Sequence, residues 1–597
     1  MSVIRSEIRP GAYFDSAVLM QLQRGLTQLP GVADAGVVMA TPANCELLEQ
    51  SGLLTADAKQ AGVNDLLIVV RAESEDGAER ALTHVDELLT RRRSAIAQEF
   101  RPKSLETAFK QMPEAGWVLI SVPGRFAAGV AHEAIQLGRH VFLYSDNVSL
   151  GDEVALKQAA RAKGLLVMGP DCGTAIIGGV GLGFANRVRR GRIGLVGASG
   201  TGLQAITSHI HGLGAGVSHA IGTGGRDLKH EVGAATARQA LDVLTRDTGT
   251  DVIVLVSKPP APEVATQLLA AARATGKPVV VDFIGYPPPG RQLAGLHFAT
   301  TLREAAEVAV KLARGKAGKA SDGDTGSSPS PQPPISAALR GPWSPAGRGS
   351  SAVSSSLITN QPITAPFLRG LFSGGTLAYE SMLGLQALLA PLYSNVPISE
   401  GQRLPDLLHS QGHTILDLGE DVFTVGRLHP MLDNDLRLRR LRQEAADPEV
   451  GVILLDVVLG EGAHPDPAAE LAPGIAEAKR GRSLEVVAIV IGTDEDPQDL
   501  GSQVQRLAQA GAIVFQSTTE AVDYVSRRLG RDTGAANPVP VALDRFDQTP
   551  FAALNVGLES FYTSLVGQGA AALHVDWRPP AGGNERLMAI LAKLKKQ

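Results

Sequence analysis

A short apolar run followed by glycines and hydroxyl side chains, at residues 191–202, can bind an anion. Ile193–Val196 has the character of a buried parallel strand, and a helical period of apolar residues begins at Leu203. The turn between them contains Ser199, Gly200, Thr201 and Gly202. A turn from a strand into a helix aims free N–H groups and the positive end of the helix dipole at whatever lies above it. The pattern therefore predicts a phosphate or carboxylate site, and the alternative is an ordinary strand-to-helix turn.

A second version of the pattern occurs at residues 370–377, where an apolar run again precedes small residues and a helical start. A third glycine turn, at residues 221–227, follows the next strand and is expected to face the first turn. The candidate anion-binding residues are Ser199, Gly200, Thr201, Gly202, Gly224, Gly225, Arg226, Ser373, Gly374, Gly375 and Thr376. The repetition favours the functional interpretation over a structural one.

Three further side chains are candidates for catalysis. Lys258 and Arg427 could stabilise negative charge that develops on a reacting group, as Arg226 could. His429 could act as an acid or a base, although a histidine that caps its own loop before Pro430 is the alternative. We expect no metal site and no redox cofactor.

Composition limits the class of protein. The chain has 597 residues, 44% of them hydrophobic, which suits several domains with cores of their own. Its net charge of −5 and the lack of a basic face do not favour nucleic-acid binding. Two cysteines, Cys45 and Cys172, exclude a disulfide framework, so we expect a cytoplasmic protein. We find no apolar run of membrane-spanning length and no signal-peptide core.

Strands alternate with helices over most of the chain, which predicts an α/β protein with several doubly wound parallel sheets. The first block is a small α+β unit with helices on one face of a ferredoxin-like or ACT-like sheet. Residues 315–362 are rich in Ser, Gly and Pro, which predicts a flexible linker. The expected units are residues 1–98, 99–190 (Rossmann-like), 191–314 and 363–530 (both flavodoxin-like), with a linker at 315–362 and a C-terminal tail at 531–597.

Three stretches resemble the succinyl-CoA synthetase superfamily. Residues 120–135 and 167–172 are similar to its CoA-binding domain. Residues 194–202 with 221–227 are similar to a ligase domain, in which the helix start holds a phosphoryl group, and residues 373–376 with 417–421 resemble a second one. Residues 423–431, 555–559 and 575–580 are similar to the FdrA family, a resemblance that extends over the whole chain.

The resemblance implies an acyl-CoA synthetase, or a component of an oxamate carbamoyltransferase in anaerobic allantoin breakdown. It implies coenzyme A or carbamoyl phosphate as ligand, and other protein subunits or further copies of the chain as partners. The family's phosphorylated His stands in a loop of small residues, but here His297 follows a bulky, proline-rich stretch, and Lys258 stands where the family has a Glu. We therefore expect no phosphohistidine relay.

Two alternatives stay open. One is an ADP-forming acyl-CoA synthetase that works with an ATP-grasp partner and uses His297 as phosphocarrier. The other is a non-catalytic subunit that binds CoA or a metabolite. The chain itself contains no ATP-grasp region.

Overall fold

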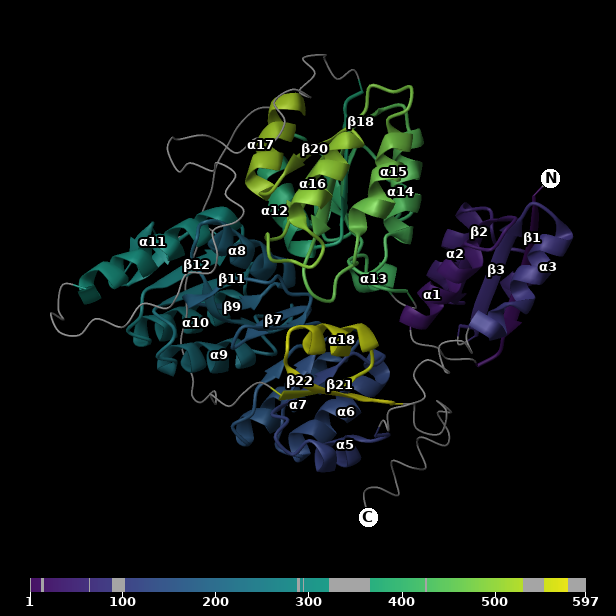
Figure 1. Cartoon of the computed structure of the whole chain (residues 1–597). Coiled ribbons are helices and arrows are strands. Elements are labelled where there is room, and N and C mark those ends of the chain that lie inside the picture. The colour runs from purple at the N-terminus through teal and green to yellow at the C-terminus, as the bar shows by residue number, and fades with distance from the viewer. Residues whose placement is uncertain are drawn as a thin grey trace, which may run out of the picture.

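Four β-sheets organise the computed structural model, in which the N-terminal unit lies apart from three larger lobes (Figure 1). The structure describes residues 2–11, 16–63, 65–88, 102–286, 290–293, 295–321, 365–424, 427–529 and 552–577. Most of the expected linker lies outside these residues, although the helix before it continues to Ser321. Within the described residues, no helix is both long and apolar enough to cross a membrane.

The N-terminal unit is a three-stranded antiparallel sheet in the order β1-β3-β2. Its elements are β1 (Val3–Arg9), α1 (Ser16–Thr27), β2 (Val32–Met39), α2 (Pro42–Gln50), η1 (Ala58–Gln60), β3 (Leu66–Ala72) and α3 (Glu75–Thr83). Side chains alternate along β3, so Ile68 packs with α1 and α3 while Leu67 packs with α2 on the other side. Helices therefore cover both faces, which corrects the prediction that they share one face.

The second sheet is parallel, with the strand order β22-β21-β4-β5-β6. Its N-terminal elements are α5 (Leu105–Gln111), β4 (Trp117–Ile120), α6 (Gly124–Gln136), β5 (His140–Leu143), α7 (Leu150–Ala162) and β6 (Val167–Met168). Its C-terminal elements are β21 (Ala552–Val556), α18 (Glu559–Gly567) and β22 (Ala571–Val575), which lie beside the others in Figure 1.

Residues 552–575 are thus part of a Rossmann-like sheet rather than of a tail, which corrects the prediction for this part of residues 531–597. If β21 and β22 are counted first, the strand order becomes 2-1-3-4-5, the flavodoxin-like arrangement. Gly557, at a φ of +118°, allows the close approach of β21 to β4: a Cβ there would lie 2.5 Å from the Ser121 hydroxyl oxygen. Ser121 Oγ also accepts the N–H of Leu558 at 2.8 Å. Two segments far apart in the sequence therefore build one sheet.

The third sheet has eight strands in the order β13-β14-β12-β11-β9-β10-β7-β8. Its elements are β7 (Thr174–Ile177), β8 (Val180–Gly183), β9 (Arg190–Ala198), α8 (Gly200–Gly212), β10 (Val217–Gly222), α9 (Ala235–Arg246), β11 (Val252–Ser257), α10 (Pro262–Ala274), β12 (Val279–Phe283), β13 (Gln292–Leu293), β14 (Leu296–Phe298) and α11 (Leu302–Ser321). The hairpin β7–β8 pairs with β10, so it belongs to this third sheet. The predicted boundary at residue 190 would place it with the second sheet instead, and the structure corrects that boundary.

The fourth sheet is parallel, in the order β16-β17-β15-β18-β19-β20. Its elements are β15 (Phe367–Phe372), α12 (Gly375–Leu385), β16 (Leu392–Ser394), η2 (Glu400–Gln402), β17 (His413–Asp417), α13 (Asp421–Thr424), α14 (Asp435–Ala446), β18 (Val450–Val458), α15 (Pro467–Ala478), β19 (Glu485–Ile491), α16 (Leu500–Gln509), β20 (Ala512–Phe515) and α17 (Thr518–Leu529). One apolar core joins the third and fourth sheets, with Leu203 and Ile206 of α8 and Leu377 and Met382 of α12 among its members. This shared core brings the starts of α8 and α12 together.

Candidate functional site

The turn into α8 has backbone N–H groups that the helix itself does not use. Ser199 is the N-cap, and its hydroxyl accepts the N–H of Gly202 at 3.0 Å. The N–H groups of Gly200 and Thr201 stand in the first turn of the helix, so no carbonyl within the helix accepts them. The buried Thr174 hydroxyl has no partner in the described part of the chain and lies 3.3 Å from a Cβ built on Gly200. Unused donors on this turn fit a small anion.

The turn into α12 is already filled by an anion of the protein itself. The Asp456 carboxylate accepts the N–H of Ser373 at 2.7 Å, its hydroxyl at 2.9 Å and the N–H of Gly374 at 2.9 Å. Asp456 is buried at the end of β18, and the buried Arg437 guanidinium lies 3.5 Å from it. This occupancy corrects the prediction that Ser373 and Gly374 bind a ligand anion.

The two helix starts touch each other. The hydroxyls of Ser199 and Thr376 form a hydrogen bond of 2.6 Å. A Cβ on Gly374 would lie 2.5 Å from Thr201 Cγ2, so only glycine allows this approach. Two positive helix ends face one another here, which favours negative groups nearby.

Lys258 and Asp417 both lie at this junction, beside the first residue of α12. A Cβ on Gly375 would overlap Asp417 Oδ2 and lie 3.2 Å from Lys258 Nζ. Lys258 follows β11, and Asp417 ends β17. Two different sheets thus bring an ammonium group and a carboxyl group together. Lys258 is one of the predicted site residues, whereas Asp417 is not.

Asp417 is nearly fully buried, and its pKa is raised to about 7. Burial is the largest cause; Lys258 opposes it, and the carboxylates of Glu420 and Asp456 add to it. Asp417 therefore changes charge near neutral pH, which suits a group that exchanges a proton.

His429 also lies close to Asp417, next to Gly419. A Cβ on Gly419 would lie 2.8 Å from His429 Nε2 and 3.3 Å from Asp417 Oδ1. His429 Nδ1 accepts the N–H of Met431 at 3.2 Å, so it does cap its own loop. Burial lowers the pKa of His429 to about 4, which leaves the ring neutral with its proton on Nε2. The ring can donate toward the site but does not act as a cation.

Arg427 does not reach the junction. Its guanidinium donates to Asn44 of α2, in the N-terminal unit, and lies 3.9 Å from Asp435. Arg439 makes a second link to the N-terminal unit, to Asp34 at 3.4 Å. Arg427 therefore holds two parts of the chain together, which corrects its predicted role in catalysis.

The turn with Gly224, Gly225 and Arg226 is likewise structural. Gly224, at a φ of +85°, packs so closely on the loop after β6 that a Cβ would overlap the Pro170 carbonyl. Arg226 donates to Glu153 at 2.9 Å and to a carbonyl of the same lobe. Buried Lys157 binds Glu153 and Asp227, each at 2.8 Å, and fixes the turn from below. The Arg226 guanidinium, which the prediction assigned to a phosphate, thus donates within the protein.

His297 is remote from the junction. It lies on β14 opposite Val280 of β12, which in turn is opposite Val254 of β11. Two strand spacings and four residues along the sheet separate it from Lys258, roughly 16 Å between Cα atoms. His297 therefore lies outside the group of residues that meet at the starts of α8 and α12.

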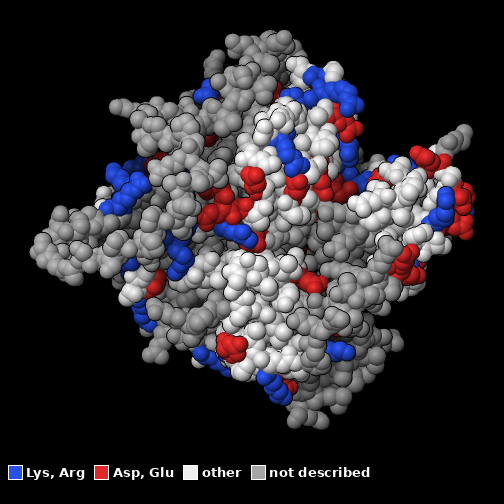
Figure 2. All heavy atoms as spheres, viewed as in Figure 1, with Lys and Arg blue, Asp and Glu red and all other residues white. Residues whose placement is uncertain are grey.

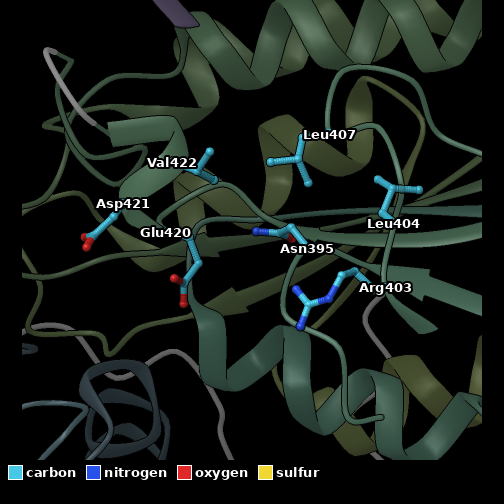
Figure 3. A pocket seen from close by; sticks show the side chains of 7 residues that line it. All are labelled: Asn395, Arg403, Leu404, Leu407, Glu420, Asp421 and Val422. Carbon is cyan, nitrogen blue, oxygen red and sulfur yellow. The ribbon is translucent and has the colours of Figure 1, made fainter. Parts of the chain in front are cut away.

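A pocket of about 440 Å³ lies beside the junction. Its lining residues are Asn395, Arg403, Leu404, Leu407, Glu420, Asp421 and Val422 (Figure 3). The Asp421 side chain points away from the two leucines in that view, and Arg403 pairs with Glu400. Over the visible surface, charges of both signs are interspersed without an extended basic patch (Figure 2). The pocket can take a small molecule with apolar and polar parts.

Three family models match the chain: a CoA-ligase model at residues 371–527, a CoA-binding domain at 188–285, and the heavy metal-associated domain of AllF at 1–103. The CoA-binding match thus falls on the block of β9–β12 rather than on residues 99–190.

Among known proteins, the chain is 43% identical to the uncharacterized protein YahF of Escherichia coli over 523 residues, 86% of this chain and 96% of that one. It is 28% identical to the α subunit of the ADP-forming succinate–CoA ligase of Methanothermobacter thermautotrophicus, over 32% of this chain and 68% of that one. A solved dinucleotide-forming acetyl-coenzyme A synthetase 1 of Ca. Korarchaeum cryptofilum is 16% identical at a TM-score of 0.22, over 70% of this chain and 85% of that one.

The metal that the name of the first domain suggests does not fit the residues present. Residues 1–103 contain one cysteine, Cys45, whereas a thiolate site needs several soft ligands. Across the described ranges, no group of three or more His, Cys, Asp or Glu side chains could hold a metal ion.

In a sheet of this order a ligand is expected at the crevice between β21 and β4, where the strand order reverses. There Gly557 packs on Ser121, and α18 begins with the acidic Glu559. The CoA-binding model instead covers β9–β12 and the α8 turn between them. Motifs, strand order and the long match to YahF agree: this chain belongs to the FdrA-like members of the succinyl-CoA synthetase superfamily.

Proposed function

We propose that this member of the acyl-CoA ligase superfamily binds an acyl or carbamoyl phosphate at the start of α8 and takes part in transfer of its acyl group. The α8 turn, Lys258 and the neighbouring pocket would together form the site. The phosphoryl group would lie on the N–H groups of Gly200 and Thr201, and the acceptor in the pocket.

One observation carries the proposal, a difference between two otherwise similar turns. In the fourth sheet, Leu371 pairs with Leu455, so the ladder continues with Phe372 opposite Asp456, whose carboxylate fills the turn. In the third sheet, the residue opposite Ala198 is Ser257, and its buried hydroxyl has no partner in the described residues. A neutral side chain thus replaces the built-in anion. The α8 turn keeps the donors that Asp456 consumes at α12, which supports an external anion there.

Lys258 supports group transfer rather than mere binding. The acceptor would attack the carbonyl carbon, a bond from that carbon to the acceptor would form, and the carbon–oxygen bond to phosphate would break. The departing phosphate would take the electron pair, and the Lys258 ammonium would stabilise its charge. Mutations that remove one such stabilising group typically cost enzymes about a hundredfold or more in rate.

Transfer of a carbamoyl group to oxamate, by a complex of several subunits, is the specific reaction that we propose to test first. The similarity to succinate–CoA ligase favours a second candidate, an acyl-CoA synthetase that works with an ATP-grasp partner. The remote position of His297 disfavours a phosphohistidine in that scheme. A non-catalytic CoA-binding subunit is the third candidate.

Binding and transfer can be tested with one set of proteins. The purified chain is titrated with carbamoyl phosphate, CoA and ATP, and then assayed with carbamoyl phosphate and oxamate alongside the products of neighbouring genes. Lys258→Ala should reduce transfer about a hundredfold, while Lys110→Ala, which removes an exposed lysine paired with Glu106, should change nothing. Binding of CoA with no binding of carbamoyl phosphate would refute the proposal in favour of the second or third candidate.

A further inference from the structure

We propose that Asp417 takes up a proton when an anion binds at the start of α8, and that its protonated carboxyl then donates a hydrogen bond to that anion. The inference rests on the proposed function, because it assumes that the α8 turn is the anion site. It adds a binding residue that is neither a cation nor a backbone donor.

Asp417 is held rigidly at the junction. Asn395 brackets its main chain: the Asp417 N–H donates to Asn395 Oδ1, and Asn395 Nδ2 donates to the Asp417 carbonyl, each at 2.9 Å. Asp417 Oδ1 accepts the N–H of Gly419 at 3.0 Å, while Oδ2 is turned to Gly375. The side chain therefore has one oxygen fixed and one directed at the start of α12.

Gly375 places that second oxygen next to α8. It stands between Gly374, which packs on Thr201, and Thr376, whose hydroxyl is bonded to Ser199. Because neither Gly375 nor Gly419 has a side chain, the carboxyl of Asp417 has room between the two turns. An anion on the α8 turn would be a close neighbour of Asp417.

The charges around Asp417 come from every element packed against it. Lys258 follows β11, Glu420 follows β17, and Asp456 belongs to β18. The ring of His429 is neutral. One ammonium group thus faces several carboxyl groups, and an arriving anion would add negative charge to this set. The neutral form of Asp417 is then the favoured one, and its pKa of about 7 makes the proton available at neutral pH.

A neutral carboxyl changes what the site can recognise. An ionised carboxylate only accepts hydrogen bonds, whereas the protonated group has one O–H to donate. The O–H of Asp417 exists only when the carboxyl is protonated. It would bind the anion in that form, and the anion would dissociate when the proton leaves. Anion binding and proton uptake are therefore one linked event.

Sulfate is the probe of choice, because its charge stays constant between pH 6 and 9. Calorimetric titration of the full chain should show sulfate affinity that falls about tenfold per pH unit above pH ~7, as one linked proton requires. Titrations in two buffers of different ionisation enthalpy should show up to one proton taken up per sulfate near neutral pH.

Asp417→Asn supplies the decisive comparison, since an amide is a neutral donor of nearly the same shape. This variant should bind sulfate independently of pH, and at pH 9 it should bind up to about a hundredfold more tightly than the wild type. Asp406→Asn, which changes an exposed carboxylate that pairs with His409, should keep the wild-type pH dependence.

Two failures can be told apart. If wild type and Asp417→Asn share one pH dependence, or if the wild type takes up no proton with sulfate, the role of Asp417 is refuted while the anion site stands. If the wild type binds no sulfate at any pH, the proposed function is refuted and the inference falls with it.

Discussion

Replacement of Asp456 by alanine removes the anion that fills the turn into α12. Two main-chain N–H groups and the Ser373 hydroxyl lose their acceptor, and the buried Arg437 loses its carboxylate partner. Each buried donor left unsatisfied costs about 1–3 kcal/mol, and breaking a buried charge pair costs about 3–5 kcal/mol in all. Because these terms overlap, we expect Asp456→Ala to lower the free energy of unfolding by about 3–5 kcal/mol.

Thermal unfolding followed by far-ultraviolet circular dichroism measures this loss. For a unit of the size of residues 367–529, about 3–5 kcal/mol corresponds to a fall in Tm of roughly 6–20 °C. Formate replaces the deleted carboxylate, and at a hundred times its Kd it should restore about 2.7 kcal/mol. Asp406→Ala, at an exposed position, serves as the control. A Tm of Asp456→Ala equal to that of the control, or no greater response to formate than the wild type gives, would contradict the role of Asp456.

Three further predictions follow from the fold and the buried charges. Lys157→Met should cost about 3–5 kcal/mol by removing the buried cation that Glu153 and Asp227 share, measured by urea unfolding with Trp117 and Trp577 as fluorescent reporters in the same lobe. A chain that ends at residue 551 should lose β21 and β22 and expose Trp117, seen as a red-shifted emission. The pKa of His429 is about 4 in the folded protein and near 6.5 when unfolded, so His429 should contribute about 3 kcal/mol to the loss of stability as the pH drops from 6.5 to 4, and His429→Gln should remove that contribution in acid titrations.

The repeated strand, turn and helix could be predicted from the sequence because each lies within about a dozen residues. Lys258 could be predicted for the same reason, because it directly follows a clear apolar strand. Asp417 and Asp456 lie in the last residues of strands, but nothing local indicates that they meet the α12 turn, because strand order brings them there. Their position at the ends of parallel strands was the available signal.

The remaining differences also arise from contacts between distant segments. Composition could not indicate that residues 552–575 pair with β4, since pairing joins strands some 435 residues apart in sequence. Arg427 looks like an anion-binding cation until Asn44, 383 residues away, is seen to accept its hydrogen bond. The Gly224–Arg226 turn looks like a phosphate loop until its contacts with Pro170 and Glu153 are known.

The central claim is that the α8 turn lacks the built-in anion that the α12 turn has, and that a ligand supplies it. Calorimetric titration with inorganic phosphate of Ser257→Asp and Ser257→Asn tests this claim most directly, because the two variants have the same shape and differ in charge. A carboxylate at residue 257 would take the place that Asp456 takes at α12, so Ser257→Asp should bind phosphate at least tenfold more weakly than the wild type, and Ser257→Asn about as tightly. Equal phosphate binding by both variants, or no phosphate binding by the wild type, would contradict the account.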